Sequence, residues 1–315
     1  MIEEFDSVII QTEGLTKIYE GKVKANLDIN LKVYKGEIFG IVGPNGAGKT
    51  TLIRQLTGEL MPTSGKIRIS GIDVIENPDE IKKIAGVCPQ EASLFNYLTV
   101  WEHLYYFARL RGLRKEKAKK RVEEVINNLN LMSYKNRLVG MLSGGLKRKV
   151  FVALSILGNP FILFLDEPTT GLDPQSRREV WNIIRNMRNE HGTTIILTTH
   201  YMEEAEQLCD RVAIIKDGRI VKQGSLEKLR GELKYDLKIR VPSQTFRKIS
   251  YKLSHINHKL IRHRNHVDIL LDKKNVSAAG LVEDILMSLQ KEVVLTQPSL
   301  EDIYLEVVGY EENTE

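Results

Sequence analysis

The chain has 315 residues, of which 28% are charged and 42% hydrophobic, and its net charge is +5. These values are ordinary for a soluble globular protein with one large or two moderate domains. The modest positive charge permits a nucleic-acid or membrane-surface partner without favouring one. Cys88 and Cys209 provide neither a disulfide framework nor metal-ligand spacing. No apolar run approaches the ~20 residues of a membrane-spanning helix. The first residues lack the features of a signal peptide, so we expect a reducing, cytosolic compartment.

A glycine-rich loop follows the first predicted strands, which lie between residues 8 and 31. The loop connects a buried strand at 37–42 to a helix that begins with Thr50, Thr51 and Leu52. It fits the P-loop pattern G-x-x-x-x-G-K-[ST] at every fixed position. Its residues are Gly43, Pro44, Asn45, Gly46, Ala47, Gly48, Lys49 and Thr50.

The chemistry of this loop suits a phosphate chain. Glycines let backbone N–H groups point inward, and the helix N-terminus adds partial positive charge. Lys49 can reach the β- and γ-phosphates, and the Thr50 hydroxyl can ligate Mg²⁺. The alternative, a glycine-rich turn without a ligand, is disfavoured by the flanking strand and helix.

The middle of the chain alternates short strands and helices. A strand is predicted at 66–70, and a buried strand at 84–88 ends just before Gln90. Thr99 and Glu102 form a predicted capping box at the start of a helix. A second amphipathic helix is predicted at 115–131. Its basic run, residues 114–121, is interpreted as a solvated helix face.

Two carboxylates follow the most apolar strand. Ser143, Gly144 and Gly145 open a helix, and the all-apolar strand at 161–165 then ends in Asp166 and Glu167. In P-loop enzymes such a strand lies beside the P-loop strand, so Asp166 can hold the Mg²⁺ shell and Glu167 can act as general base. A structural capping role suits one carboxylate better than both.

The remaining elements complete an α/β pattern. Asp173 is a predicted N-cap for a helix at 174–190, with Pro174 at its first position. A strand at 194–197 leads to His200, and a short acidic helix and a hairpin at 211–221 follow. Strands that alternate with helices predict a sheet with parallel strands.

The composition changes near residue 231. The later elements are predicted in the order β-α-β-β-α-β, followed by a closing helix at 300–308. This is the order of a ferredoxin-like fold. We therefore predict an ATP-binding domain at 1–230 and a small α+β accessory domain at 231–315.

The set of motifs along residues 9–224 resembles the ATP-binding subunit of an ABC transporter. The resemblance includes Walker A at 43–50, the Q-loop at Gln90, the signature at 142–145, Walker B at 162–167, the D-loop at 171–173 and the switch residue His200. It implies a P-loop NTPase core with ABC-type antiparallel β and helical subdomains. It departs from the commonest signature at Leu146, where that signature has glutamine, so the resemblance does not imply contacts of this side chain with the partner subunit.

The resemblance also implies roles for individual residues. Glu167, His200 and Gln90 are candidate catalytic residues, and Thr50, Gln90 and Asp166 are candidate Mg²⁺ ligands. Tyr19 would stack on adenine. The P-loop and Thr51 would bind ATP, while Ser143, Gly144 and Gly145 would contact ATP held by a second subunit. Asp173, in the D-loop, would both cap its helix and take part in ATP binding.

The signature continues with Lys-Arg-Lys, and the stretch 297–305 follows in the C-terminal region. Both resemble the drug, polysaccharide and lipid exporter group. The resemblance implies ATP and Mg²⁺ as cofactors, a homodimer of ATPase subunits, a separate transmembrane permease and a peripheral position on the cytoplasmic side of the membrane. No nucleic acid is expected.

Two alternatives differ in class. A soluble ABC ATPase acting on nucleic acid or ribosomes would show tandem ATP modules or a long coiled coil, and neither is visible. A catalytically silent regulatory module is disfavoured by the intact Lys49, Asp166, Glu167 and His200.

Overall fold

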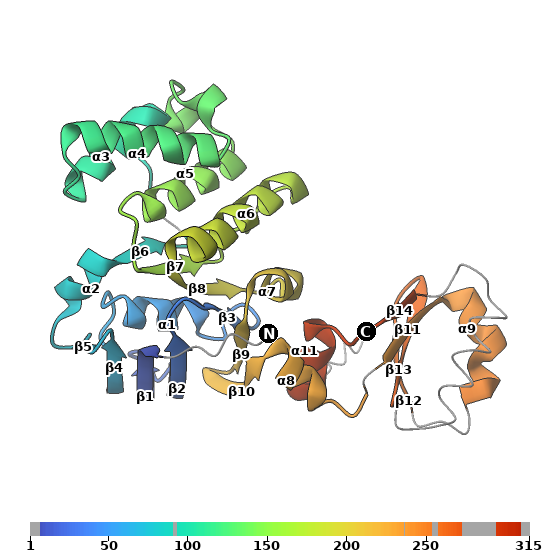
Figure 1. Ribbon diagram of the computed structural model, residues 1–315. Helices are drawn as coiled ribbons and strands as arrows, with labels where there is room; N and C mark the ends of the chain where they lie inside the picture. Colours follow the sequence, from blue (N-terminus) through green and yellow to red (C-terminus); the bar gives the residue numbers. More distant parts are fainter. Residues whose placement is uncertain (1–6, 91–92, 236, 254–257, 273–293, 310–315) are drawn as a thin grey trace. The chain divides into compact units, whose positions relative to one another are not determined.

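The computed structural model describes residues 7–90, 93–235, 237–253, 258–272 and 294–309 (Figure 1). The chain forms two compact units, Met1–Gln223 and Gly224–Glu315. The boundary therefore precedes the expected one after residue 230. The reason is a helix that the sequence analysis did not predict, α8 (Leu226–Gly231), which packs against the closing helix α11 (Leu300–Val308).

A six-stranded sheet forms the centre of the first unit. Its strand order is β10-β9-β3-β8-β7-β6. Neighbours from β9 to β6 pair in parallel, as the alternation of strands and helices predicts. Every residue of β3, β7 and β8 is buried, which is typical of strands with both faces covered. The bounds are β3 (Ile38–Val42), β6 (Ala85–Cys88), β7 (Ile162–Asp166), β8 (Thr194–Thr199), β9 (Arg211–Lys216) and β10 (Arg219–Ser225).

A second sheet in this unit is antiparallel and has the order β2-β1-β4-β5. One hydrophobic core joins it to the central sheet through Ile10 and Ile67 from this sheet and Phe39 and Phe164 from the other. Helix α1 contributes Leu52 to the same core. The bounds are β1 (Val8–Ile18), β2 (Lys24–Tyr34), β4 (Ser64–Ile69), β5 (Ile72–Asp73), α1 (Lys49–Leu56) and α2 (Pro78–Ile84).

Three helices of the first unit begin at capping residues that the sequence indicates. The Thr99–Glu102 capping box is present, and the side chains of Ser143 and Asp173 accept the N–H groups of Leu146 and Ser176. Each cap satisfies a backbone donor that the helix itself cannot pair. The bounds are α3 (Val100–Leu110), α4 (Lys115–Asn128), η1 (Met132–Tyr134), η2 (Val139–Met141), α5 (Gly144–Ile156), α6 (Pro174–His191) and α7 (Met202–Leu208).

The second unit contains a four-stranded antiparallel sheet of order β12-β13-β11-β14. Helix α9 (Ser243–Ile249) packs on β11 and β13, where Phe246 joins Ile239 and Ile269 in a small core. The helix predicted at 278–289 lies outside the described residues. The remaining bounds are β11 (Leu237–Pro242), η3 (Ser250–Leu253), β12 (His258–Arg262), β13 (His266–Leu271) and β14 (Val294–Thr296).

Among the described residues, no helix has both the length and the hydropathy that crossing a bilayer requires.

Candidate nucleotide-binding site

The P-loop lies between β3 and α1, as the sequence predicts. Packing requires two of its glycines. A Cβ on Gly43 would lie 2.3 Å from the Ile215 carbonyl oxygen, and one on Gly48 would lie 2.1 Å from that of Ala25. Gly46 has φ +80° and nothing within 4 Å of a Cβ placed there. The loop is thus held tightly at both ends and opens onto free space in the middle, where a phosphate chain fits.

Lys49 is buried and makes three close polar contacts. Its Nζ donates to the carbonyl oxygens of Gly43 at 2.9 Å and Pro44 at 3.0 Å. The same Nζ lies 3.4 Å from Glu167 Oε1. The two groups come from the first turn of α1, which follows β3, and from the residue after β7. Contrary to the expectation from the sequence, these parallel strands are not adjacent, because β8 lies between them, yet both bring their groups to the same edge of the sheet.

Glu167 occupies a constrained position. Its φ is +49°, in the left-handed region, and its N–H donates to Thr198 Oγ1 at 3.0 Å. The Thr170 hydroxyl donates to Oε2 at 3.0 Å, and His200 Nδ1 lies 3.2 Å from Oε2. Burial raises the pKa of this carboxyl, but the contacts with His200, Lys49 and Thr170 outweigh burial and hold the pKa below its usual value of 4.5. Glu167 is therefore ionised at neutral pH.

The three candidate Mg²⁺ ligands lie on neighbouring elements. The Thr50 hydroxyl donates to Gln90 Oε1 at 3.2 Å, so the P-loop helix touches a residue two positions after β6. Asp166, the last residue of β7, is 2% exposed and accepts a hydrogen bond from the Thr198 hydroxyl. One hydroxyl, one amide oxygen and one carboxylate are oxygen donors of the kind that Mg²⁺ prefers. The residues present fit the ion.

Arg148 is a residue of this site that the sequence analysis did not single out. Its guanidinium, 7% exposed, donates to backbone carbonyls on both sides of the site. Those of Pro89 and Gln90 lie at 2.7 and 2.9 Å, and that of Glu167 lies at 2.6 Å. It also donates to the carbonyls of Asp166 and Pro168. One side chain of α5 therefore fixes the backbone at the Q-loop to the backbone at the end of β7.

A helical pattern could have revealed Arg148. It stands four and eight residues before Val152 and Ile156, which are both buried, and so lies on the buried face of α5. A charged residue on such a face requires several partners.

The predicted signature residues do not join this group. Among the described residues, no hydrogen bond or ion pair connects Ser143, Gly144 or Gly145 to Lys49, Thr50 or Glu167. Ser143 instead caps its own helix. Gly144 lies at an open pocket of about 610 Å³, which is also lined by Gln90, Arg148, Thr170 and Gly171.

Tyr19 and Asp173 lie at the surface. Tyr19 is 37% exposed, and Lys17 Nζ lies 5.4 Å from its ring centroid. The role of Tyr19 in stacking on adenine therefore stays a prediction. Asp173 caps α6 through Ser176, whose hydrogen bonds to the carboxylate lower the pKa of Asp173 below its usual value of 3.8.

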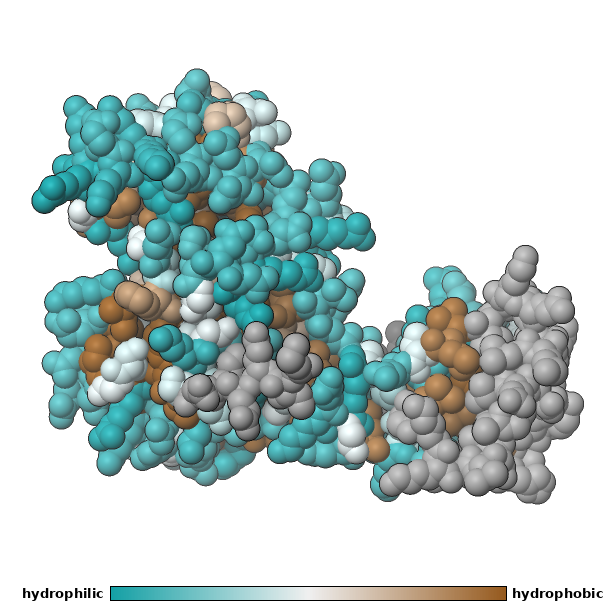
Figure 2. Space-filling model, in the orientation of Figure 1, coloured by the Kyte–Doolittle hydropathy of each residue, from teal (hydrophilic) through white to brown (hydrophobic). Residues whose placement is uncertain are grey.

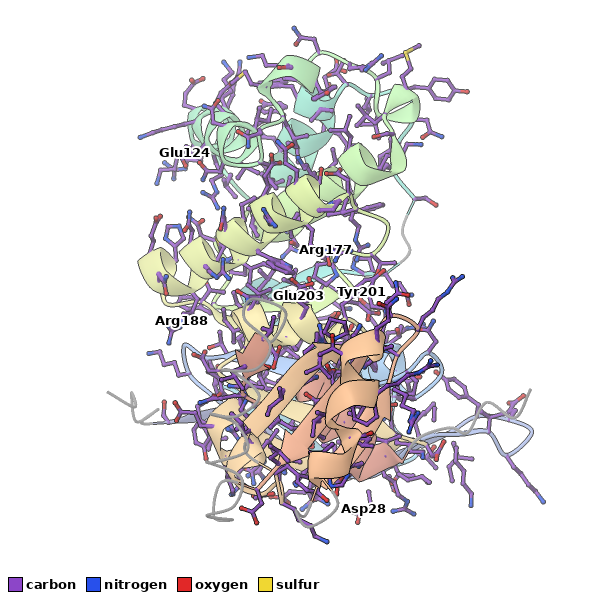
Figure 3. The ribbon with its side chains drawn as sticks, turned by 90° about the vertical axis from the view of Figure 1, so that its right-hand side faces the viewer. Asp28, Glu124, Arg177, Arg188, Tyr201 and Glu203 are labelled. Carbon is purple, nitrogen blue, oxygen red and sulfur yellow. The ribbon has the colours of Figure 1, made fainter. Side chains whose placement is uncertain are left out.

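An aromatic contact with Tyr201 helps to hold the His200 ring in position. The ring of Tyr201 lies 4.1 Å from that of His200, and the Arg177 guanidinium lies 4.6 Å from the Tyr201 centroid. Figure 3 labels Arg177 on α6 and Tyr201 before α7. The buried Glu204 of α7 accepts hydrogen bonds from Thr169 and Trp181 at 2.7 and 2.9 Å. The loop after β8, which carries His200, is thus fixed to α6.

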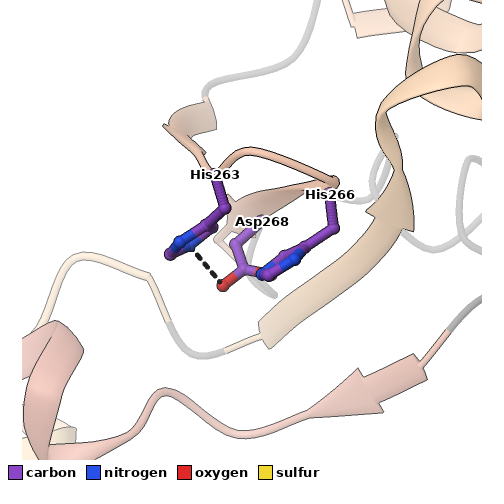
Figure 4. A group of neighbouring side chains, drawn as sticks. All are labelled: His263, His266 and Asp268. Carbon is purple, nitrogen blue, oxygen red and sulfur yellow. Dashed lines mark ion pairs between the residues drawn. The ribbon is translucent and has the colours of Figure 1, made fainter.

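The second unit contains a polar cluster of His263, His266 and Asp268 (Figure 4). Asp268 is already paired with Arg240 at 2.7 and 2.9 Å and with Lys238 at 3.0 Å. Burial opposes the charged carboxylate, but the bonds from Arg240 and Lys238 prevail and lower the pKa of Asp268 to about 2. Two cations on the carboxylate oppose a bound metal ion, so the cluster is explained as a structural ion-pair network.

The fold and the first unit's site together define a P-loop nucleoside triphosphatase. A family profile described as "ABC transporter" matches residues 27–170. The chain is 37% identical over 307 residues to the daunorubicin/doxorubicin resistance ATP-binding protein DrrA of Streptomyces peucetius, and the match covers 96% of this chain and 92% of DrrA. The chain therefore belongs to the ABC transporter ATP-binding proteins, and it is an ATPase.

Other relatives are much longer. The chain is 42% identical over 238 residues to ABC transporter A family member 3 of Arabidopsis thaliana, of which the match covers 25%. A solved dimeric bacterial ABC transporter cassette is 27% identical with a TM-score of 0.65, and the match covers 69% of this chain and 99% of the cassette. A related structure of the same cassette is in a post-hydrolysis state with ADP and Pi. The drug-resistance protein DrrA and the glucosylceramide transporter ABCA12 of Mus musculus, which is 41% identical over 76% of this chain and 9% of its own length, are consistent with the expected drug and lipid exporter group.

Proposed function

We propose that this ATPase powers export of a substrate through a separate transmembrane subunit, to which it binds on the cytoplasmic side of the membrane. One observation carries the proposal. Two large side chains directly after the Q-loop, Phe95 and Tyr97, are 63% and 92% exposed. Gln90, which precedes Phe95 by five residues in the sequence, accepts a hydrogen bond from Thr50 of the P-loop helix. A surface rich in aromatic side chains is typical of partner interfaces, and here it follows in the chain a residue that touches the nucleotide site.

The catalytic roles follow from the contacts around Glu167. An ionised carboxylate can accept a proton from the water that attacks the γ-phosphate. His200 orients Glu167, and Lys49 is placed to leave Glu167 for the phosphates when ATP binds. Mg²⁺, held by Thr50, Gln90 and Asp166, would neutralise charge on the phosphate oxygens. Arg148 keeps Gln90 and Glu167 in a fixed relation.

A second copy of the chain would complete the site. Ser143 caps a helix of thirteen residues, and among the described residues no hydrogen bond or ion pair joins it to the P-loop of its own chain. The free N-terminus of such a helix suits a phosphate. A head-to-tail homodimer would bring Ser143, Gly144 and Gly145 to the ATP of the other copy, with Asp173 beside it. The dimeric state of the similar bacterial cassette supports this arrangement.

The strand order of the second unit supports a ferredoxin-like accessory domain. In chain order the four strands are β11, β12, β13 and β14, and the sheet places the first between the third and the fourth. The helix that would complete the pattern lies outside the described residues.

The direct test is reconstitution with a candidate permease. Co-expression with a membrane protein encoded beside the gene should yield a stable complex that transports in vesicles only with hydrolysable ATP. A chain that copurifies with ribosomes or nucleic acid, and not with any membrane protein, would support the soluble alternative instead.

A further inference from the structure

Positive charge is concentrated where α3 ends and α4 begins. Residues 109–121 comprise the last two residues of α3, the turn and the first half of α4, and are named here the basic turn. They contain eight lysines and arginines and one acidic residue, Glu116. Eight positive charges and one negative charge give +7, whereas the whole chain has +5, so all other residues together carry −2. A local excess of this size creates a strong positive field on one part of the surface.

Most of this charge is not paired with carboxylates. Arg114, Lys115, Lys117 and Lys120 are exposed. Within the described part of the chain, an acidic partner lies close only to Lys119, at 3.6 Å from Glu116, and to Arg121, at 3.5 Å from Glu124, the residue of α4 labelled in Figure 3.

Two further arginines of the basic turn have backbone partners. Arg109 donates to the carbonyl of Leu113, and Arg111 donates to those of Lys82 and Ala85. Carbonyl partners hold the side chains in place without cancelling their charge. The basic turn is therefore a positioned cationic surface rather than an ordinary solvated helix face with mixed charge.

An exposed apolar stripe leads into the basic turn. Tyr106 and Leu110, four residues apart on α3, are 51% and 81% exposed. Phe95, at the other end of α3, packs its ring against those of His103 and Phe107 at 5.7 and 6.5 Å. Residues three or four apart share a helix face, so Leu110 lies on the same side of α3 as Tyr106 and as Phe107, which contacts Phe95. Figure 2 shows that the surface over α3 and α4 is otherwise mostly hydrophilic.

We propose that the basic turn, with Tyr106 and Leu110, docks on the surface of an anionic lipid bilayer. Clusters of four to eight lysines and arginines bind anionic headgroups, and neighbouring apolar and aromatic side chains insert at the interface. An aliphatic side chain as exposed as Leu110 suits acyl chains and offers nothing to a phosphate backbone. The inference rests on the proposed function in one respect. If the chain binds a transmembrane subunit through Phe95, it lies next to the bilayer in which that subunit is embedded.

Flotation of the full chain with lipid vesicles, without any permease, tests the proposal. The chain should bind vesicles of phosphatidylglycerol and phosphatidylcholine, and it should not bind vesicles of phosphatidylcholine alone. Raised salt should weaken the binding, because exposed charges are screened. Absence of binding to the phosphatidylglycerol vesicles at low salt would overturn the proposal.

Matched variants locate the surface. Lys117→Glu/Lys120→Glu should lower vesicle affinity by about tenfold or more, and Leu110→Ser should lower it by about threefold or more. The control Lys32→Glu/Lys66→Glu makes the same charge change at exposed positions of the antiparallel sheet and should retain binding. Equal losses in the two double variants would refute the assignment to the basic turn.

Two readouts separate this proposal from its alternatives. Single-stranded RNA that binds the chain and competes away the vesicles would mean that the basic turn is a nucleic-acid surface, which also overturns it. ATPase activity in Lys117→Glu/Lys120→Glu should stay within about twofold of the unmodified chain, because none of these residues touches the nucleotide site. Failure to find a permease would leave vesicle binding unchanged, so the two proposals fail independently.

Discussion

Lys49 Nζ and Glu167 Oε1 lie 3.4 Å apart in a site where both side chains are about 5% exposed or less. Lys49 is expected to bind the phosphates, and Glu167 is expected to accept a proton from the attacking water. In this structure the charges of the two side chains neutralise each other. Their contact keeps two buried charges paired until a nucleotide replaces the carboxylate as the partner of Lys49. Removing one member would leave the other uncompensated.

Lys49→Ala should therefore have two separable effects. Nucleotide hydrolysis should fall by about 100-fold or more, because the charge that stabilises the transferring phosphoryl group is lost. Stability should also fall, because Glu167 remains buried without its cation. The double variant Lys49→Ala/Glu167→Gln should recover much of the stability and none of the activity. Calorimetric melting and phosphate release measure the two effects, and full hydrolysis in Lys49→Ala would reject the role of Lys49.

Glu167→Gln tests the shared site. The amide keeps the shape of the side chain but cannot accept a proton, so hydrolysis should slow by about 100-fold while ATP binding persists. ATP should then hold two copies together, with Ser143 of each copy at the ATP of the other. Size-exclusion chromatography with light scattering should show a dimer with ATP and a monomer without it. A chain that stays monomeric at saturating ATP, alone and with its permease, would contradict the two-copy arrangement.

Arg148→Met should destabilise the site from within. The guanidinium donates to five backbone carbonyls that would lose a buried partner, and the cost should be about 3 kcal/mol or more of unfolding free energy. Hydrolysis should decrease more than ATP affinity, because Gln90 and Glu167 lose their fixed relation. Arg178→Met, an exposed arginine on α6, is the matched control. Equal stability of the two variants in urea titrations would show that Arg148 is dispensable.

Lys49 and Arg148 differ in whether their roles in the site could be predicted from the sequence. The P-loop, the Asp166–Glu167 pair and the caps at Thr99, Ser143 and Asp173 were predictable because each depends on a few adjacent residues. Arg148 depends on three segments that are distant in sequence, and only the folded chain brings their carbonyls to one side chain.

Short helices are a second kind of feature that could not be predicted from the sequence. α2 and α8 were not predicted, since seven and six residues give too few helical repeats for an apolar pattern to stand out. The domain boundary differed from the expected one for the same reason, because α8 belongs with the second unit.

Glu37→Gln should change the pH dependence of stability. Burial raises the pKa of this carboxyl from 4.5 to about 7, against the opposing bonds from the Tyr34 N–H and from Arg211. The native state then keeps a proton that the unfolded chain loses, so the unfolding free energy falls as pH rises from about 4.5 to about 7. The amide removes this term and should stabilise the protein by about 1–3 kcal/mol more at pH 8 than at pH 5. Urea titrations followed by tryptophan fluorescence measure the difference, and equal effects at both values would mean that Glu37 is ionised throughout.

Phe95→Ala should uncouple the ATPase from its permease. The ring is 63% exposed yet lies over His103, which is fully buried, so the side chain is held in one place before any partner binds. A preorganised aromatic anchor typically contributes ~2 kcal/mol or more to an interface, which corresponds to about 30-fold in affinity. Basal ATPase activity should stay within about twofold of the unmodified chain, because Phe95 touches neither Lys49 nor Glu167.

A second exposed phenylalanine provides the control for this prediction. Phe161 is 72% exposed and directly precedes β7, at the end of the strand opposite to Asp166. Phe161→Ala removes the same ring from a surface away from the Q-loop, so permease affinity and transport should both persist. Titration of detergent-solubilised permease with each variant gives the affinities, and vesicle uptake gives the transport rates. Loss of basal hydrolysis in Phe95→Ala with the complex intact would place Phe95 in the catalytic machinery and remove it from the interface.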